Sequence, residues 1–305
     1  MKRAGDYLVY LVVRLTICIV QALPLATGHA LARRLAWLFG DVLKVRAQVV
    51  DENLAFAFPE LPRPERCRLA RQMWEHLFLL AIEVAHTPRK LHETNWRDYV
   101  QLHDKAEFMR RLISGRPTMV VTGHFGNFEI GGYMLGILGF PTYSVARPLD
   151  NPYLDRFLAR FRGATGQRLI PKNGGYEQIE TVMRNGGILA FLADQYAGPK
   201  GCWVEFFGRP ASAHKAIALL AFEHQAQVVV AAVPRRGRPM QFDLRRCDET
   251  DPLWDRPETR GVRELTQWFT AALEGAVRIW PDQYWWLHRR WKDPRPKSQP
   301  RQRAA

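Results

Sequence analysis

The 305-residue sequence lacks the patterns that mark several common classes of protein. Its four cysteines, Cys18, Cys67, Cys202 and Cys247, lie far apart and form no Cys-x-x-Cys pair. This spacing argues against a zinc ribbon or a disulfide framework and indicates a reducing compartment. The sequence contains neither a Gly-x-Ser-x-Gly elbow nor a Gly-x4-Gly-Lys-Ser/Thr loop, so a serine hydrolase and a P-loop protein both lack support.

Acidic residues are scarce relative to basic ones. The sequence has 30 Asp and Glu residues against 44 Lys and Arg residues, which gives a formal net charge of +14. Such an excess favours a negatively charged partner, namely anionic lipid, nucleic acid or an acidic carrier protein. The length of the chain allows one substantial hydrophobic core.

Charged residues are nearly absent from residues 7–27, an apolar stretch about long enough to cross a bilayer. Arg14 is the exception, and at the centre of a bilayer it would cost roughly 2.5–3.5 kcal/mol. The polar residues of this region recur at helical spacing and form one stripe: Arg3, Tyr7, Tyr10, Arg14 and Gln21. We therefore expect a helix that either lies in the membrane interface or spans the bilayer with this stripe against protein.

The sequence divides into three predicted regions. Residues 28–46 favour a second amphipathic helix whose basic face suits an anionic lipid surface, so residues 1–46 are expected to anchor the protein to a membrane. Basic residues near the N-terminus favour the cytoplasmic side. Residues 47–291 are expected to form one α/β domain, and residues 292–305 a basic, proline-rich, disordered tail.

From Pro117 onward, strand-like and helix-like segments alternate. Strands are predicted at residues 118–122, 142–146, 168–171, 188–193, 228–233 and 241–245. Helices are predicted at residues 128–138, 152–165, 176–185, 214–224 and 257–279. Such alternation is typical of an α/β fold with a mostly parallel central sheet flanked by helices, here preceded by the N-terminal membrane-associated helical segment.

The most informative stretch, Thr122-Gly123-His124-Phe125-Gly126-Asn127-Phe128-Glu129, predicts a strand end, a sharp turn and a helix start. His124 falls in the turn and Glu129 in the first helical turn, so the two side chains meet only if Glu129 reaches back. A histidine held by a carboxylate can take a proton from an alcohol that attacks a carbonyl carbon. The backbone N–H groups of Gly126 and Asn127 would bind the developing negative charge. The alternative is a buried histidine that is bonded locally in a turn.

Four polar side chains directly follow predicted strands: His124, Arg147, Lys172 and Asp194. If these strands are parallel, the four residues converge on the edge of the sheet where ligands collect. A metal site is the rival use of His124, Glu129 and Asp194. Zinc prefers closer histidine spacing such as His-x3-His, so we expect no metal and no other cofactor.

Six ordered stretches, at residues 53–61, 123–129, 146–152, 193–195, 204–211 and 281–291, resemble the motifs of one family. They include Gly-His-Phe-Gly-Asn-Phe-Glu, Ala-Asp-Gln and a closing Gln-Tyr-Trp-Trp-Leu-His-Arg-Arg-Trp. This set resembles the bacterial lipid A biosynthesis (late) acyltransferases of the lysophospholipid acyltransferase superfamily. His214-Lys215 departs from the pattern, because many of the lipid A enzymes carry Gly/Pro-rich residues there, and this leaves the acceptor open.

The resemblance implies His124 as general base and Glu129 as its orienting partner. It also implies substrate-binding roles for four further residues: Arg147, Asp194, Glu205 and Arg209. Arg147 would bind phosphate or a carbonyl oxygen, and Asp194 would position the acceptor or Arg147. Ordinary roles remain open for all four, namely a salt bridge at the start of a helix, a turn cap and an exposed charged pair.

The activity implied is that of a membrane-bound O-acyltransferase, which moves a fatty acyl chain from acyl carrier protein to a hydroxyl of a lipid A precursor. The expected partners are acyl carrier protein, anionic membrane lipid and a glycolipid acceptor, without nucleic acid, at the cytoplasmic side of the inner membrane. A phosphatidylinositol mannoside or lysophospholipid acceptor is the alternative within this class. A non-catalytic basic protein that binds membranes or nucleic acid is the alternative of another class.

Overall fold

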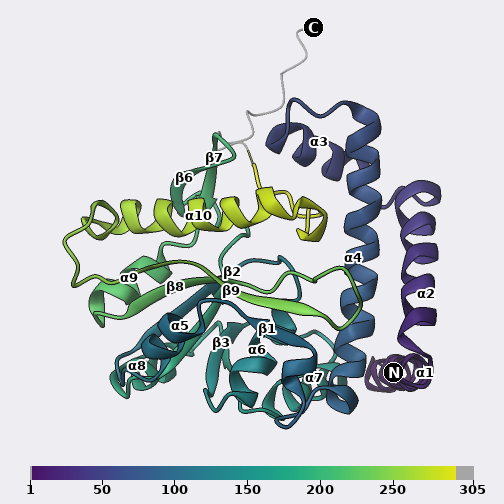
Figure 1. Cartoon of the computed structure of the whole chain (residues 1–305), viewed down its shortest axis with the longest axis horizontal. Coiled ribbons are helices and arrows are strands. Elements are labelled where there is room, and N and C mark those ends of the chain that lie inside the picture. Colours follow the sequence, from purple (N-terminus) through teal and green to yellow (C-terminus); the bar gives the residue numbers. More distant parts are fainter. Residues whose placement is uncertain (1, 293–305) are drawn as a thin grey trace, which may run out of the picture.

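The structure is a computed structural model that describes residues 2–292. Its centre is a seven-stranded sheet (Figure 1), whose strands lie in this order: β1 (Val100–Leu102), β9 (Phe242–Thr250), β8 (Gln227–Ala232), β2 (Thr118–Thr122), β5 (Ile188–Leu192), β3 (Thr142–Ala146) and β4 (Arg168–Pro171). The five strands from β8 to β4 run parallel, whereas β9 is antiparallel to β8. Residues 233–241, which join β8 to β9, are too few for a parallel crossover.

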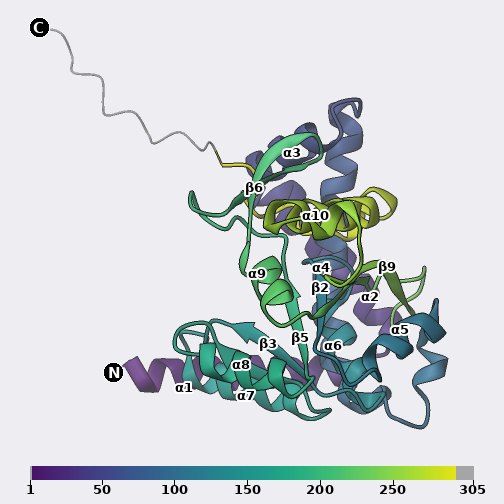
Figure 2. The same cartoon turned by 90° about the vertical axis from the view of Figure 1, so that its left-hand side faces the viewer.

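Helices cover both faces of this sheet (Figures 1 and 2): α5 (Lys105–Leu112), α6 (Phe128–Ile137), α7 (Pro152–Gly163), α8 (Tyr176–Arg184), α9 (Ala216–Glu223) and α10 (Val262–Ile279). Alternate side chains of β2 point to opposite faces. Met119 and Val121 belong to the core beneath α9 and α10, whereas Val120 belongs to the core beneath α5 and α6. The predicted α/β fold with a mostly parallel sheet is confirmed.

A two-stranded hairpin, β6 (Cys202–Phe206) and β7 (Arg209–Ala213), is not predicted from the sequence. Its turn is Phe207-Gly208, with φ values of 54° and 66°, as a two-residue type I′ turn requires. An aromatic residue is unusual at the first of these positions, which is why the hairpin signal is weak.

The N-terminal helices lie beside the sheet (Figure 1) and comprise α1 (Lys2–Ala22), α2 (Leu25–Trp37), α3 (Ala47–Ala57) and the long α4 (Arg63–Lys90). The predicted polar stripe of α1 packs against protein. The Tyr7 ring lies 5.1 Å from that of Tyr153 in α7, the Arg14 guanidinium lies 4.8 Å from the Phe157 ring, and Gln21 donates a hydrogen bond to α4.

The opposite face of α1 is apolar and exposed, with Leu8 62%, Val12 58% and Leu15 63% accessible. By length and composition, α1 is the helix among the described residues that is able to cross a membrane. The division of the chain at residue 46 stays a prediction. The predicted tail at residues 292–305 lies outside the described residues, except for Lys292.

A fully buried carboxylate in α4 fixes the turn that follows β2. Glu83 is 0% exposed and accepts two hydrogen bonds of 2.7 Å from the Arg235 guanidinium, one of 3.0 Å from the Met240 amide and one of 3.1 Å from the Asn127 side chain. Arg235 also donates to Nδ1 of His76. Burial, helped by the nearby Arg235 charge, lowers the pKa of His76 well below its ordinary value, so the ring is neutral. Its Nε2 therefore carries the proton and donates to the carbonyl oxygen of Gly126, 3.2 Å away.

Replacing Glu83 with leucine should be strongly destabilising, because it leaves the Arg235 charge buried without its partner. Loss of one member of a buried pair costs about 3–5 kcal/mol, and removal of both is often close to neutral. Denaturant unfolding followed by circular dichroism should show this loss for Glu83→Leu and a smaller one for Glu83→Leu/Arg235→Met. The exposed pair Arg147–Asp150 is the control, and Asp150→Leu should cost less than about 1 kcal/mol. A Glu83→Leu loss as small as that would contradict the assignment.

Candidate active site

Two neighbouring parallel strands bring His124 and Asp194 together. β2 and β5 pair in register from Thr118↔Ile188 to Thr122↔Leu192, and each residue of the pair stands two positions beyond the end of its strand. Nδ1 of His124 lies 2.9 Å from one Asp194 carboxylate oxygen, and the His124 backbone N–H donates to the other, also at 2.9 Å. Gly123 allows this approach, since a Cβ there would lie only 3.1 Å from the carboxylate carbon.

The Asp194 carboxylate is ionised and fixes the tautomer of His124. Burial acts to raise the pKa of Asp194, but the His124 ring, its two hydrogen bonds and the nearby His288 together hold that pKa below its ordinary value. An ionised carboxylate accepts the proton of Nδ1, so the lone pair of a neutral His124 lies on Nε2. In a neutral His124, Nε2 is thus the ring nitrogen that is able to accept a proton.

Glu129 does not hold His124, and the predicted pairing of the two is wrong. Both carboxylate oxygens of Glu129 are bonded to the Arg162 guanidinium of α7, one of them at 3.0 Å from Nε. Glu129 lies in the first turn of α6, and Gly126 with φ +57° turns the chain between the two residues. The carboxylate that bonds His124 is that of Asp194, which follows the neighbouring strand β5, and not that of Glu129.

The predicted oxyanion donors, Gly126 and Asn127, are also committed elsewhere. The Gly126 N–H donates to the carbonyl oxygen of Gln283 at 3.0 Å, and the Asn127 N–H donates to that of Val233 at 2.7 Å. A Cβ on Gly126 would lie 2.3 Å from the same Val233 oxygen, so only glycine fits here. The Asn127 side chain caps α6 by accepting from the Ile130 amide. These amides hold the turn in place and have no proton left for a substrate.

The structure does not bring the three predicted substrate-binding residues Arg147, Glu205 and Arg209 to the His124–Asp194 pair. Arg147 is largely exposed and forms a salt bridge of 2.8 Å with Asp150. Glu205 and Arg209 lie on the β6–β7 hairpin, where the Glu205 amide bonds the Gln267 side chain and the Arg209 guanidinium lies 4.1 Å from the Phe56 ring.

Two residues that the sequence did not single out surround the reactive nitrogen of His124. The Gln195 side-chain nitrogen lies 3.4 Å from Nε2 of His124 and 3.2 Å from Nε2 of His288. The rings of the two histidines are 5.1 Å apart, and His288 stacks on Trp285 at 5.9 Å. Gln195 belongs to the Ala-Asp-Gln stretch and His288 to the closing stretch, but no role was predicted for either side chain.

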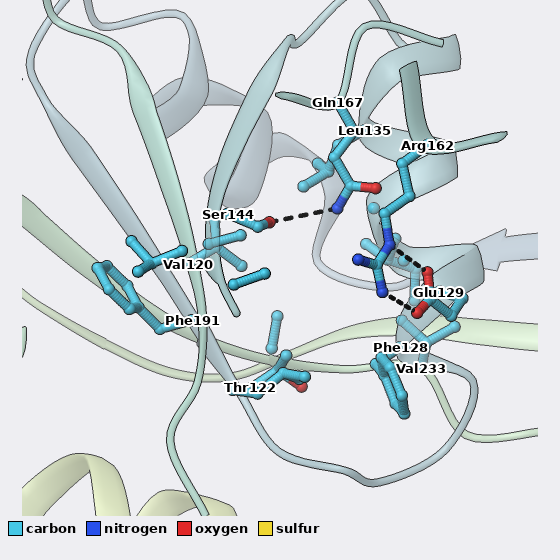
Figure 3. Close-up of a pocket in the computed structure, with 18 of the residues that line it drawn as sticks. Val120, Thr122, Phe128, Glu129, Leu135, Ser144, Arg162, Gln167, Phe191 and Val233 are labelled. Atoms are coloured by element: carbon cyan, nitrogen blue, oxygen red, sulfur yellow. Dashed lines mark hydrogen bonds and ion pairs between the residues drawn. The ribbon is translucent and has the colours of Figure 1, made fainter. Parts of the chain in front are cut away.

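An apolar cavity of about 130 Å³ lies between the sheet and α6 (Figure 3). Phe128, whose ring lies 5.3 Å from that of His124, lines it, together with the Glu129–Arg162 pair. The space exists because small residues face each other where a core would carry large ones: Gly131 and Gly132 of α6, and Ser144, Ala146, Ala190 and Ala231 of the sheet. A cavity of roughly 150 Å³ with apolar walls stays dry and holds benzene, so this one suits hydrocarbon.

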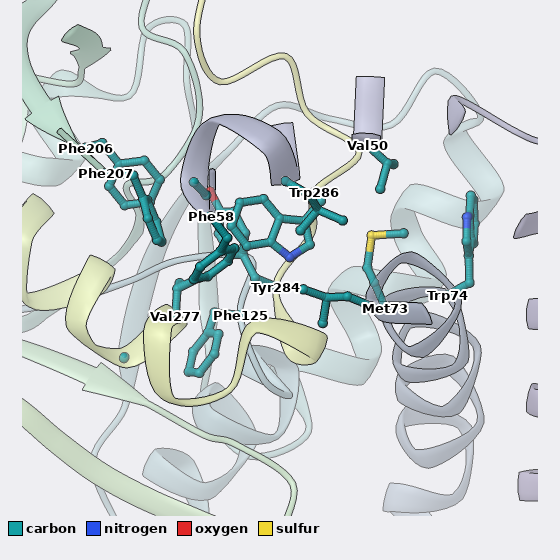
Figure 4. Close-up of a cluster of buried hydrophobic side chains, with 14 of the residues drawn as sticks. Val50, Phe58, Met73, Trp74, Phe125, Phe206, Phe207, Val277, Tyr284 and Trp286 are labelled. Carbon is teal, nitrogen blue, oxygen red and sulfur yellow. The ribbon is translucent and has the colours of Figure 1, made fainter. Parts of the chain in front are cut away.

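An aromatic cluster holds the segment that carries His288 (Figure 4). The Trp286 ring packs edge-on against Phe58 and Phe207, at 5.8 and 5.9 Å. The buried side chain of Asn53 in α3 donates hydrogen bonds of 2.6 Å to the carbonyl oxygens of Trp286 and His288. These contacts join the motif stretch at residues 53–61 to the closing stretch at residues 281–291.

A model of the bacterial lipid A biosynthesis acyltransferase family matches residues 2–293. The chain belongs to this family. It is an acyltransferase of lipid A biosynthesis, and the predicted family and enzyme class are confirmed. Within this family, the His124–Asp194 pair and the adjoining cavity are the candidate site of acyl transfer.

Individual relatives have low sequence identity to this chain, but the alignments cover most of both chains. The lipid A biosynthesis lauroyltransferase of Escherichia coli (strain K12) is 24% identical over 291 residues, covering 92% of this chain and 90% of the relative. The lipid A biosynthesis palmitoleoyltransferase of the same organism is 24% identical, covering 88% and 86%. A crystal structure of the 1-acyl-sn-glycerophosphate (LPA) acyltransferase from Thermotoga maritima matches at 13% identity with a TM-score of 0.40, covering 86% of this chain and 100% of that one.

Exchanging Asp194 for asparagine should cut kcat sharply with little change in KM, because the amide no longer fixes the proton on Nδ1 of His124. The corresponding change in a Ser-His-Asp enzyme costs about 10⁴-fold, and a loss of about 10²–10⁴-fold is expected here. Steady-state kinetics of acyl transfer measure both constants. Asp248→Asn, in a solvent-exposed part of β9, is the matched control and should retain parental kcat. Parental kcat in Asp194→Asn would show that another group orients His124.

Proposed function

We propose that this acyltransferase moves a fatty acyl chain from the thioester of acyl carrier protein to a hydroxyl of a lipid A precursor, with His124 as general base. The observation that carries this proposal is the geometry of His124. A buried carboxylate bonds Nδ1, which leaves Nε2 able to accept a proton, and the ring lies 5.3 Å from that of Phe128 in the wall of an apolar cavity. Family membership supplies the reaction class.

The reaction follows from the geometry of His124. The acceptor hydroxyl donates its proton to Nε2 as its oxygen attacks the thioester carbonyl carbon. The carbonyl π pair moves onto oxygen, and the resulting imidazolium is stabilised by the Asp194 carboxylate. When the intermediate collapses, the carbon–sulfur bond breaks and the leaving thiolate takes the proton back from His124. No cofactor is needed to balance these steps.

We place the acyl chain in the cavity between the sheet and α6. Its walls are apolar apart from Thr122, the Ser144–Gln167 pair and the Glu129–Arg162 pair (Figure 3). In this arrangement, Glu129 contributes by fixing Arg162 at the cavity wall. Arg147, on the exposed rim beyond β3, is the candidate contact for a lipid phosphate, and Glu205 and Arg209 are lesser candidates for contacts to the acceptor.

Charge and exposed apolar surface support the proposed donor and location. A net charge of +14 would attract an acidic carrier protein and the anionic inner leaflet of a membrane. The outward face of α1 is apolar along its length, which suits the inner membrane, with the active site on the cytoplasmic side.

Removing the base should abolish transfer. His124→Ala should lose about 10²–10⁴-fold in kcat in an assay of purified protein with acyl carrier protein thioesters and a lipid A precursor. His92→Ala, at an exposed histidine after α4, is the control and should keep parental activity.

Mass spectrometry of lipids from a deletion strain identifies the acceptor, because the lipid A of that strain should lack one acyl chain. An active His124→Ala protein, or unchanged lipid A in the deletion strain, would overturn the proposal.

Filling the cavity should shorten the preferred acyl chain. Leucine at position 190 adds three carbon atoms to the wall, and each displaced CH₂ group is worth about 0.8 kcal/mol, so we expect Ala190→Leu to favour donors shorter by about two to four carbons. Competition between acyl donors of graded length measures the shift. Ala106→Leu, on the exposed side of α5, is the matched control. An unchanged chain-length profile in Ala190→Leu would place the acyl chain elsewhere.

A further inference from the structure

We infer that the side-chain amide of Gln195 donates the hydrogen bond that stabilises the oxyanion, and that His288 positions this amide. The inference rests on the proposed function, because it concerns the intermediate formed at His124. It assigns a role to two residues whose side chains have none in the family motifs quoted above.

The backbone amides nearest to His124 are already hydrogen-bonded within the protein. The Gly126 and Asn127 amides, which stand at the usual place for an oxyanion hole, are both bonded to backbone carbonyl oxygens. The His124 amide is bonded to Asp194. The Gln195 amide, in contrast, lies 3.4 Å from the reactive nitrogen of His124 and contacts it directly. An oxygen that develops charge next to Nε2 therefore lies within reach of this N–H₂ group.

The two imidazole rings determine the orientation of the Gln195 side-chain amide. Because Nδ1 of His124 donates to Asp194, Nε2 is an acceptor and must face the nitrogen end of Gln195 rather than its oxygen end. The same nitrogen lies 3.2 Å from Nε2 of His288. One proton of the N–H₂ group thus points to each imidazole.

His288 is suited to hold one of these two protons. Burial, together with the nearby His124, lowers the pKa of His288 below its ordinary value, so the ring is neutral and its Nε2 can accept. Trp285 stacks on the ring with an angle of 26° between the planes, and Asn53 holds the backbone carbonyl of His288. His288 is therefore a rigid acceptor, which leaves the second amide proton aimed at the reaction centre.

During the reaction, the second proton of the Gln195 amide exchanges one hydrogen-bond partner, Nε2 of His124, for another, the oxyanion. In the resting protein it faces Nε2 of His124. When the acceptor hydroxyl binds, its own proton occupies Nε2. As the new carbon–oxygen bond forms, the π pair of the thioester carbonyl moves onto oxygen, and the Gln195 N–H donates to that oxyanion. On collapse the carbonyl re-forms, the carbon–sulfur bond breaks, the thiolate takes the proton from His124, and the amide returns to its resting contact.

Two variants of Gln195 test the donor. Removal of one oxyanion donor costs about 10²–10³-fold in kcat, so Gln195→Ala should lose that much while KM changes by less than about threefold. Gln195→Glu keeps the shape of the side chain but cannot donate when ionised, and it should lose at least as much. Gln241→Ala, whose amide bonds the Asp98 carbonyl far from His124, is the matched control and should retain parental kcat. Thermal unfolding of each variant checks that the fold is intact.

A double-mutant cycle tests the positioning role of His288. His288→Phe keeps an aromatic ring to stack on Trp285 but removes the acceptor, and kcat should fall about tenfold or more because the amide loses its orientation. In the Gln195→Ala background the same change should cost almost nothing, since there is no amide left to orient. A merely structural role would give the same loss in both backgrounds.

The outcomes separate this inference from the proposed function. If His124→Ala is inactive but Gln195→Ala and Gln195→Glu keep kcat within about threefold of the parent, Gln195 is not the donor and the inference falls while the function stands. If the losses caused by His288→Phe and Gln195→Ala are additive, the positioning role falls. If His124→Ala is active, the proposed function itself falls.

Discussion

The buried carboxylate of Glu83 is the constraint on which the rest of the site depends. A charge that is removed from water must find partners, and the three partners of Glu83 come from two distant parts of the chain: Arg235 and Met240 from the β8–β9 connection and Asn127 from the start of α6. Through Arg235 and His76 the network also reaches the Gly126 carbonyl. The turn that carries His124 is therefore held by α4 through the Gly126 carbonyl and the Asn127 side chain, while its amides bond the carbonyl oxygens of Gln283 and Val233.

Alternating strands and helices were sufficient to predict the architecture of the sheet, because apolar β-branched runs of four to six residues between amphipathic segments have few other folds open to them. From β2 onward, the observed strands agree with the predicted ones to within a few residues, except for the extended end of β9 and the β6–β7 hairpin. The hairpin was missed because its turn places Phe207 in the left-handed region, which sequence rules reserve for glycine or asparagine.

Which residues of the site contact one another could be predicted only if the order of the strands in the sheet was known. His124 and Asp194 were both expected at the carboxyl edge of the sheet, but their contact depends on β5 pairing with β2 rather than with another strand, and no local pattern encodes that order. Glu129 was favoured as the partner because it is near in sequence. In the folded chain a residue 70 positions away is nearer to the ring nitrogen. The contacts of Gln195 with His124 and His288 depend on three-dimensional proximity in the same way.

Helix α7 lies between α1 and the cavity in which we place the acyl chain. Tyr153 and Phe157 of α7 contact α1, whose outward face is apolar and exposed, and Arg162 of α7 lines the cavity. A helix with its side chains is about 10–12 Å across. The exposed apolar face of α1 and the cavity are therefore separated by two packed helices, α7 and α1 itself, or roughly 20–24 Å of protein. A hydrocarbon tail that came from a membrane at α1 would have to pass around these helices to enter the cavity.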